Sequence, residues 1–377
     1  MEFMLNESQR IFQRTMRDFC EKEIRPKIEE LDREHRFSPE IYDKLVEMGL
    51  PGVIYPEEYG GLGLDLLTLV LGMEEISRIS MGMAMAQGWV LYGPPVYHSG
   101  NDEQIRKFLT PVIKGEKKGC FALTEPNAGS DVGSMTTSAK KTSDGYLVNG
   151  SKIFITNADI SDYMLLAART GSTQDKHRGI SLFVVDSKSE GITINPLNKI
   201  GAGACSNCEI GFQDVAVPAE NLLGEENRGF YALMKCLEGF RVLFGVMGLG
   251  VAQGAYEEAL RYAGERVQFG KTIGKFQAIQ FMLSDMYTQI EASRLMIYRA
   301  TWMIGNGMKA TKEASAAKLM ASETAMNTAI KAMQIFGGYG YMEEFPIQRY
   351  FREAKLAEVG EGTSEVQRMI IAKEIGL

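Results

Sequence analysis

One acidic residue near the end of the chain lies where it could take part in proton transfer. Glu361 opens the stretch Glu-Gly-Thr-Ser-Glu, directly before a predicted final helix. Ser364 and Gln367 have the spacing of a capping box, so this helix should begin at Thr363 or Ser364. Taken alone, Glu361 is a solvated loop acid favoured by the nearby helix N-terminus. Whether it does chemistry depends on the rest of the chain.

A second group of residues could hold a flat, polar ligand. The segment from Phe121 to Asp131 reads Phe-Ala-Leu-Thr-Glu-Pro-Asn-Ala-Gly-Ser-Asp. It begins inside a strand predicted over 120–123, which gives way to a Pro-Asn-Ala-Gly-Ser turn. Such a turn can hold an anion or the polar edge of a ring, although it could also be an ordinary turn. Farther on, Phe154 and Thr156 are two residues apart and so share one strand face. Together these residues could stack against and hydrogen-bond a heterocycle.

A third cluster lies at a break between two predicted helices. Arg266, Lys271 and Lys275 gather there, next to Phe276 and Gln277. Arginine could clamp a diphosphate through paired hydrogen bonds. The alternative is a solvated turn between helices.

Composition excludes several classes of protein. The 377 residues are 45% apolar and 24% charged, which is typical of a globular chain with two or three packed units. The net charge of −7 gives no support for nucleic-acid binding, although a local basic pocket for a phosphorylated ligand is compatible with it. The five cysteines are scattered and the three histidines are far apart, so no metal site is expected.

The sequence shows no targeting or membrane segment. Its N-terminus is acidic and polar, unlike a secretory or transit peptide. Residues 79–96 carry no charge, but glycines and prolines interrupt them, so we expect a buried core helix there. The cysteine pattern is typical of reduced thiols. These features predict a cytoplasmic protein without membrane insertion.

The pattern of the elements divides the chain into an N-terminal helical domain (1–117), a middle β-domain (118–226) and a C-terminal helical bundle (227–377). The first contains caps at Asn6 and Ser38 and an apolar helix from Leu66 to Ile79. The second has short segments rich in β-branched and aromatic residues, which favours an antiparallel sandwich or barrel. The fold class is therefore α+β and multidomain.

The third part should hold long helices over roughly 230–265, 276–305 and 312–336. Small residues around Gly248 to Gly254 should permit close packing of the first of these. In the helix predicted over 312–336, one face should point to the core. Its residues are Ala316, Leu319, Met326, Ile330 and Met333.

In combination and in this order, the motifs resemble the acyl-CoA dehydrogenase family across essentially the whole chain. FALTEPNAGSD is similar to that family's first signature, KIFITN to its flavin-stacking strand and ERVQFGK with a later FQ to its helix break. QIFGGYGY followed by EGTSEVQR resembles its second signature. The resemblance implies a helical domain, a middle β-domain and a C-terminal four-helix bundle. It also implies non-covalent FAD, an acyl-CoA substrate, an electron-transfer flavoprotein as partner and a homotetramer.

The resemblance also assigns roles to matching positions. Around the flavin it implies Phe121, Leu123, Thr124, Gly129, Ser130, Phe154, Ile155 and Thr156. For the pyrophosphate and adenosine it implies Arg266, Gln268, Phe269 and Gln277, completed across a subunit interface by Gln334, Ile335, Phe336, Gly337 and Gly338. Thr363, Ser364 and Glu365 would contact FAD at the last helix, and the CoA ester would lie near Ser130, Glu238, Arg241, Gly360 and Gly362.

Glu361 matches the family's catalytic base. The α-proton of a thioester is weakly acidic, so a positioned base must act together with polarisation of the carbonyl. The resemblance implies that the backbone N–H of Glu361 and a flavin ribityl hydroxyl hold this carbonyl, while the β-hydrogen leaves as hydride to flavin N5.

Three positions depart from the family's pattern. Phe154 replaces a frequent Trp, and Glu238 replaces an Asp ahead of Arg241. Gly360 replaces an aromatic residue directly before the base, which removes a ring and adds backbone freedom. We hypothesise that Gly360 widens the acyl pocket for a branched, cyclic or bulky group. The alternative is that another side chain, such as Phe240 or Trp89, fills the space.

Three other functions stay open from the sequence. The same site could run as an enoyl-CoA reductase, because hydride transfer is reversible. An oxidase would pass the electrons to O₂, although family oxidases usually carry a further C-terminal domain. A non-catalytic flavin- or acyl-CoA-binding protein would not need Glu361.

Overall fold

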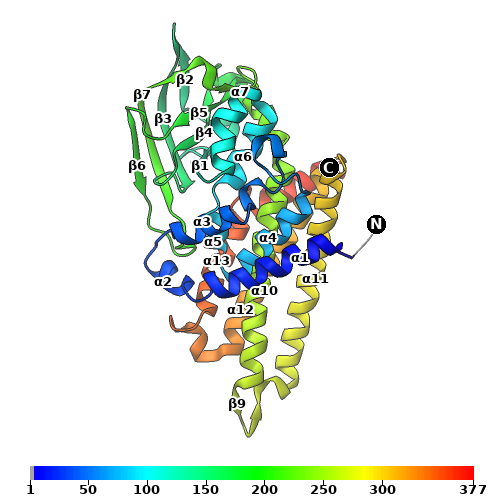
Figure 1. Cartoon of the computed structure of the whole chain (residues 1–377). Helices are drawn as coiled ribbons and strands as arrows, with labels where there is room; N and C mark the ends of the chain where they lie inside the picture. The colour runs from blue at the N-terminus through cyan, green and yellow to red at the C-terminus, as the bar shows by residue number, and fades with distance from the viewer. Residues whose placement is uncertain (1–3) are drawn as a thin grey trace.

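The computed structural model describes residues 4–377 (Figure 1). Residues 1–3, the start of the segment in which we expect no targeting peptide, lie outside the described residues. Helices precede and follow a sheet, and the predicted fold class is confirmed. The sheet lies at one end of the molecule, and the long C-terminal helices extend away from it (Figure 1).

Short helices form the first part of the chain. The caps are as predicted: Asn6 and Gln9 form a reciprocal capping box, and Ser38 caps a helix with Pro39 at its first position. The uncharged stretch 79–96 is not one helix, because Ser80 ends one helix and caps the next. The helices are α1 (Glu7–Phe19), α2 (Ile28–Arg33), α3 (Pro39–Glu47), α4 (Leu66–Ile79), α5 (Met81–Met85), α6 (Trp89–Ser99), α7 (Asp102–Gln104) and α8 (Thr110–Ile113).

The main sheet has the strand order β6-β7-β3-β2-β4-β5-β8, and β1 pairs with β4. We predicted an antiparallel sheet, but the sheet is mixed, because β4 pairs in parallel with both β1 and β2. Residues 145–156 form one continuous strand, β3. The strands are β1 (Gly119–Ala122), β2 (Ser138–Lys141), β3 (Gly145–Thr156), β4 (Tyr163–Arg169), β5 (Ile180–Asp186), β6 (Ile192–Pro196), β7 (Asn207–Pro218) and β8 (Leu222–Leu223).

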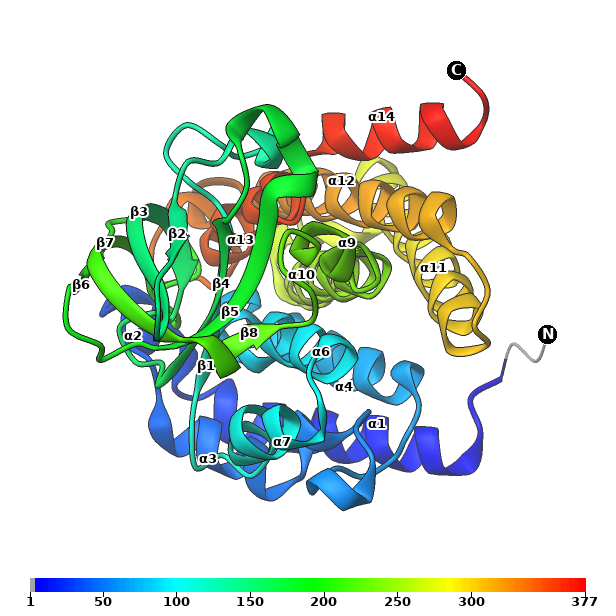
Figure 2. The same cartoon turned by 90° about the horizontal axis from the view of Figure 1, so that it is seen from above.

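The C-terminal helices surround α10, which Figure 2 shows between α4 and α6 on one side and α12 on the other. The helix predicted over 230–265 is interrupted at Lys235 and Cys236, which separate α9 from α10. The elements are α9 (Gly229–Met234), α10 (Leu237–Glu265), the hairpin β9 (Val267–Gln268) and β10 (Lys271–Thr272), α11 (Gln277–Gly305), α12 (Thr311–Phe336), α13 (Ile347–Val359) and α14 (Ser364–Glu374).

Small residues allow α10 to approach its neighbours closely, as the sequence predicted. A Cβ atom at Gly250 would lie 2.5 Å from the Cβ atom of Ser77, and one at Gly254 would lie 2.1 Å from the Arg78 carbonyl oxygen. The core-facing side predicted for α12 is wrong, because Ile330 is 49% exposed. The side of α12 that is buried consists mainly of alanine, serine and threonine, and it also contains Lys318.

Candidate active site

The loop between α13 and α14 holds Glu361 in a left-handed conformation. Its φ is 52° and that of Gly362 is 85°. The buried amide of Gln367 supports the turn by donating to the carbonyl oxygens of Glu361 at 3.1 Å and of Gly362 at 3.0 Å. The helix begins where predicted, but its cap is Thr363, whose hydroxyl accepts from the Val366 N–H. Because Gln367 points to the loop, the predicted Ser364–Gln367 capping box is wrong.

Glu361 is half-buried, and the charges of two cations act on its carboxyl group. Desolvation of its carboxyl group raises its pKa to about 6, while Lys318 of α12 and Arg241 of α10 favour the charged form. Arg241 is itself buried, and burial lowers its pKa against the attraction of Glu361 and Glu238. A carboxyl group titrating near pH 6 with cationic neighbours is suited to accepting a proton at neutral pH.

The ring of Phe244 occupies the space beside Gly360. A Cβ atom at Gly360 would lie only 2.3 Å from Cζ of the Phe244 ring, which is buried. The φ of Gly360 is −73°, a value that any residue can adopt. A glycine is therefore needed here for the room that it leaves to the ring, and not for its backbone conformation. The alternative to a wider pocket, that another side chain fills the space beside Gly360, is therefore confirmed. The residue that fills it is Phe244, and not Phe240 or Trp89.

Aromatic rings connect this loop to the predicted flavin side. Phe240 lies one turn before Phe244 on the same face of α10. Its ring centroid is 6.2 Å from that of Phe121 in β1. The structure therefore brings the first signature, α10 and the Glu361 loop to one place, although they are far apart in the sequence.

A buried ion pair fixes the turn that follows β1. Lys152 Nζ donates to the Leu123 carbonyl oxygen at 2.8 Å and to Glu125 at 2.9 Å. The Glu125 carboxylate also accepts from the backbone N–H groups of Thr136 and Thr137. Burial would raise the pKa of Glu125, but Lys152 and these donors lower it to about 2. The predicted flavin residues Thr124, Gly129 and Ser130 lie on or beside this fixed turn.

Phe154 lies at a bulge in β3. The register with β7 shifts between Lys152 and Ile155, and Phe154 has a φ of 61°. Its ring is 63% exposed, whereas Ile155 is buried in the sheet. The Thr156 hydroxyl accepts from the Asn207 amide at 3.1 Å. A bulge that turns an aromatic ring outward in a strained conformation is typical of a ligand-binding strand.

Glu238, a predicted CoA contact, is engaged within the protein. Its carboxylate accepts from the Ala310 N–H at 3.1 Å and from the Thr311 hydroxyl. It therefore stabilises the N-terminus of α12. Its contact with CoA stays a prediction, as do the other assigned contacts with substrate and cofactor.

A separate cavity of about 480 Å³ unites the helix break with the Gly337 turn. Tyr262 stacks on Phe336 with ring centroids 4.2 Å apart, and the Arg266 guanidinium lies 5.5 Å from the Tyr339 ring centroid. Two motifs predicted to hold the same part of FAD thus line one cavity. The predicted residues among its lining are Arg266, Gln268, Ile335, Phe336, Gly337 and Gly338.

Three other predicted residues lie near this cavity without lining it. Phe269 and Gly270 both have positive φ, 51° and 75°, and form the two-residue turn of the β9–β10 hairpin. The Phe269 ring is 93% exposed at this tip. Gln277 begins α11 and Gln334 lies near the end of α12, and both are exposed. Cationic, aromatic and glycine-rich groups together fit a nucleotide diphosphate.

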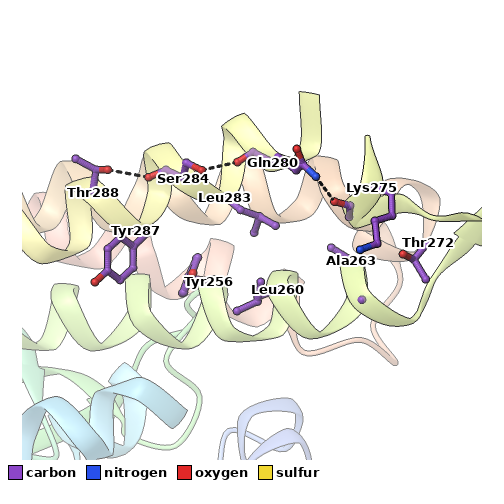
Figure 3. Close-up of a pocket in the computed structure, with 12 residues that line it drawn as sticks. Tyr256, Leu260, Ala263, Thr272, Lys275, Gln280, Leu283, Ser284, Tyr287 and Thr288 are labelled. Carbon is purple, nitrogen blue, oxygen red and sulfur yellow. Dashed lines mark hydrogen bonds between the residues drawn. The ribbon is translucent and has the colours of Figure 1, made fainter. Parts of the chain in front are cut away.

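A groove of about 670 Å³ runs between α10 and α11 (Figure 3). Tyr256 and Leu260 line it from α10, and Tyr287 lines it from α11. The Ser284 and Thr288 hydroxyls donate to backbone carbonyls of their own helix. None of the residues assigned to FAD or substrate lines this groove.

Residues 4–377 contain neither a cluster of side chains that could hold a metal ion nor a helix that could span a membrane. No three or more His, Cys, Asp and Glu side chains are grouped to hold a metal ion there. None of the helices in this part of the chain is both long and apolar enough to span a bilayer.

Family models identify the chain. Residues 6–116, 120–215 and 227–376 match the N-terminal, middle and C-terminal domains of acyl-CoA dehydrogenase. The protein belongs to the acyl-CoA dehydrogenase family. The predictions of an oxidoreductase of this family and of FAD as its cofactor are confirmed, and the general reaction of the family is supported.

Individual relatives of this acyl-CoA dehydrogenase differ in their named reactions. The chain is 44% identical to the caffeyl-CoA reductase–Etf complex subunit CarC of Acetobacterium woodii, covering 97% of this chain and 98% of the relative. It is 43% identical to the 3-(aryl)acrylate reductase of Clostridium sporogenes, covering 98% of each. It also resembles the solved butyryl-CoA dehydrogenase of Megasphaera elsdenii, with 40% identity, a TM-score of 0.97 and full coverage of both chains.

Two residues of the site, Phe244 and Lys318, were not predicted from the sequence, and a third, Gln367, was predicted in another role. Phe244 could have been found from its position one turn after Phe240 and three residues after Arg241. Lys318 is a single cation in an alanine-rich run, which is unusual for a helix face that packs closely. Gln367 was noticed, but a cap was the wrong role for it.

Proposed function

We propose that Glu361 is the general base that removes the α-proton of an acyl-CoA during FAD-dependent α,β-dehydrogenation. The observation that carries this proposal is the environment of Glu361. The residue is half-buried, the charges of Lys318 and Arg241 act on it, and the rings of Phe244, Phe240 and Phe121 connect its loop to β1. FAD, when bound, supplies the acceptor for the β-hydrogen.

The chain's own residues have separate tasks in this proposal. The Glu361 carboxylate accepts the α-proton, and its backbone N–H is the proposed donor to the thioester carbonyl oxygen. The charge of Arg241, a residue of α10, favours the ionised form of Glu361 before substrate enters. The Phe244 and Phe240 rings exclude water from the acyl group, which strengthens the interactions of the charged groups.

We also propose that the acyl group is bulky, and more specifically flat or aromatic. Gly360 leaves room for the Phe244 ring, so that an aromatic wall is supplied by α10 rather than by the loop. Aromatic rings favour stacked or edge-on contacts with other flat groups. Two relatives at 44% and 43% identity are named for caffeyl-CoA and aryl acrylates, which supports this substrate class.

A panel of acyl-CoA esters tests both proposals. Under anaerobic conditions, a 3-arylpropanoyl-CoA should bleach the flavin faster than butyryl-CoA, with branched and cyclic esters between them. A clear preference for butyryl-CoA would contradict the aromatic-pocket proposal but leave the reaction intact. If no ester of the panel bleaches the flavin, the proposed reaction is contradicted.

The reductase direction is the second candidate, since both of those relatives are named reductases. Chemically reduced enzyme mixed with an arylacryloyl-CoA should be reoxidised if the reaction runs this way. We further propose an electron-transfer flavoprotein as partner, because one relative is named as part of an Etf complex. Reoxidation by air faster than by this partner would indicate an oxidase instead. A homotetramer in the cytoplasm is the state that we propose for the active protein.

A further inference from the structure

Lys318 is a fully buried cation beside the loop that carries Glu361. Its side chain extends from α12, and Nζ donates to the Gly362 carbonyl oxygen at 2.8 Å. The Glu358 carbonyl oxygen lies at a weaker 3.4 Å. Burying an ammonium group is unfavourable unless charge and hydrogen bonds compensate it, so its place at this loop calls for an explanation.

The loop that Lys318 contacts needs support. Glu361 and Gly362 are consecutive residues with positive φ, and for glutamate this conformation is unfavourable. The Gly362 carbonyl oxygen accepts from two donors, the charged Lys318 Nζ and the neutral Gln367 Nε2. One donor comes from α12 and the other from α14, so the two helices hold the turn together.

Lys318 and Arg241 are the two buried cations of a small network of charges. The cations that act on Glu361 are Lys318, which belongs to α12, and Arg241, which belongs to α10. Lys318 faces Glu358 of α13 and Glu365 of α14 in addition to Glu361, and Arg241 faces Glu238. Burial lowers the pKa of Lys318 to about 8 against these carboxylates. At pH 7 Lys318 is therefore largely protonated, and Glu361 is largely ionised.

The Phe244 ring shields this network. Lys318 Nζ lies 5.7 Å from the ring centroid, and the same ring packs against Gly360. A cation over a ring face is attracted by it, and excluding water strengthens the attraction between Lys318 and Glu361.

We propose that Lys318 is a positioning residue for the reaction: it holds the left-handed Glu361–Gly362 turn through the Gly362 carbonyl oxygen and keeps the half-buried Glu361 ionised before substrate binds. This inference rests on the proposed function of Glu361. A purely structural lysine would stabilise the loop without changing the ionisation of the base.

Matched variants separate charge from placement. Lys318→Met should lower the maximal rate of flavin bleaching and move the acid limb of its pH profile upward by roughly one pH unit, since an opposite charge is lost. Gln367→Leu removes the neutral donor from the same carbonyl, so it should lower the rate without moving the limb. Lys331→Met, which removes a lysine of α12 that pairs with Asp285 at 3.2 Å, should change neither.

A second variant of Lys318 guards against loss of folding. Lys318→Gln keeps a donor without its charge, so it should lose less of the maximal rate but show the same upward shift. An unshifted limb in either folded, FAD-loaded variant overturns the proposal. Failure of both variants to fold or to hold FAD would assign Lys318 a purely structural role and would overturn it too.

One measurement keeps the inference apart from the proposed function. If none of the acyl-CoA esters bleaches the flavin of the wild-type protein, the proposed function fails. The ionisation of Glu361 is then followed directly. The infrared carboxyl band that differs between wild type and Glu361→Gln gives the midpoint of its titration. Lys318→Gln should raise this midpoint, and an unchanged midpoint would overturn the role of Lys318.

Discussion

Glu361 combines a strained backbone with an unusual ionisation. A glutamate with a φ of 52° persists only where surrounding contacts impose it, and Gln367 and Lys318 are those contacts. The neighbouring Glu365, by comparison, is exposed and has a lowered pKa. The environment therefore distinguishes two acids that are four residues apart and that local sequence alone treats as similar.

Replacing the base without changing its size tests its role. Glu361→Gln should retain FAD and bind acyl-CoA, but flavin bleaching should slow by roughly 100-fold or more, because the proton acceptor is lost. Stopped-flow bleaching and FAD content are the measurements. Glu190→Gln, which changes an exposed acid between β5 and β6, is the control and should bleach at nearly the wild-type rate. Near-normal bleaching by Glu361→Gln would mean that the base lies elsewhere.

The ionisation of Glu361 gives a pH dependence with a definite sign. The carboxyl group has a pKa of about 6 and must be ionised to accept a proton. At low substrate concentration the bleaching rate should therefore fall as the pH drops through about 6 and level off above it. A profile that falls only near pH 4.5, the ordinary value for glutamate, would show that desolvation does not act on this group.

At the scale of elements, the decisive contact joins α10 to the loop after α13. The Phe244 ring and the missing side chain of Gly360 share one space, so a change at either position should require a change at the other.

A reciprocal exchange tests this relation. Gly360→Tyr alone should destabilise the protein by about 1–3 kcal/mol, because the new side chain overlaps the buried Phe244 ring. Phe244→Val alone should lose stability through a cavity. The double variant should recover much of both losses, as measured by thermal unfolding of the FAD-loaded protein. It should also shift the acyl preference, and losses that simply add would show that the two positions do not share a space.

The elements also show where prediction from sequence reaches its limit. The ends of α4 were predicted correctly, since its apolar run is bounded by an Asp65 cap and by Ser80. The buried face of α12 was not, because large apolar residues usually mark a core, whereas here small residues let α10 come close. Phe244 and Lys318 gain their roles only through that close approach, which no local pattern encodes.

At the scale of the whole molecule, the two groups of residues assigned to FAD are far apart. The β1 and β3 residues lie at the sheet, and the β9 hairpin lies at the opposite end of the molecule (Figure 1). Phe240, which contacts Phe121, and Arg266 are about 39 Å apart along α10 at 1.5 Å per residue. The family resemblance implied both groups, and it assigned Gln334 to Gly338, but not Arg266, to completion across a subunit interface. The structure instead places Arg266 in one cavity with Phe336, Gly337 and Gly338 of the same chain. Only the structure gives this separation, because it depends on the direction of α10.

Such a separation favours a site shared between subunits, and exchange of subunits would reveal it. Arg266→Ala removes a charged donor from the cavity and should weaken FAD binding by roughly ten- to a hundredfold. Lys271→Ala, at the same hairpin but outside the cavity, is the control and should retain FAD. Free FAD in equilibrium dialysis is the measurement.

Mixing two defective variants then distinguishes sharing from an independent site. In a mixed oligomer, a subunit with Arg266→Ala keeps its own Glu361, while a partner with Glu361→Gln supplies its intact Arg266. If FAD is held across the interface, one site in each such pair is complete, and the mixture should bleach with acyl-CoA although neither variant does so efficiently alone. Co-expression with two different affinity tags isolates the mixed species. A mixed oligomer that forms but bleaches no faster than its parents would show that each subunit holds FAD with its own residues.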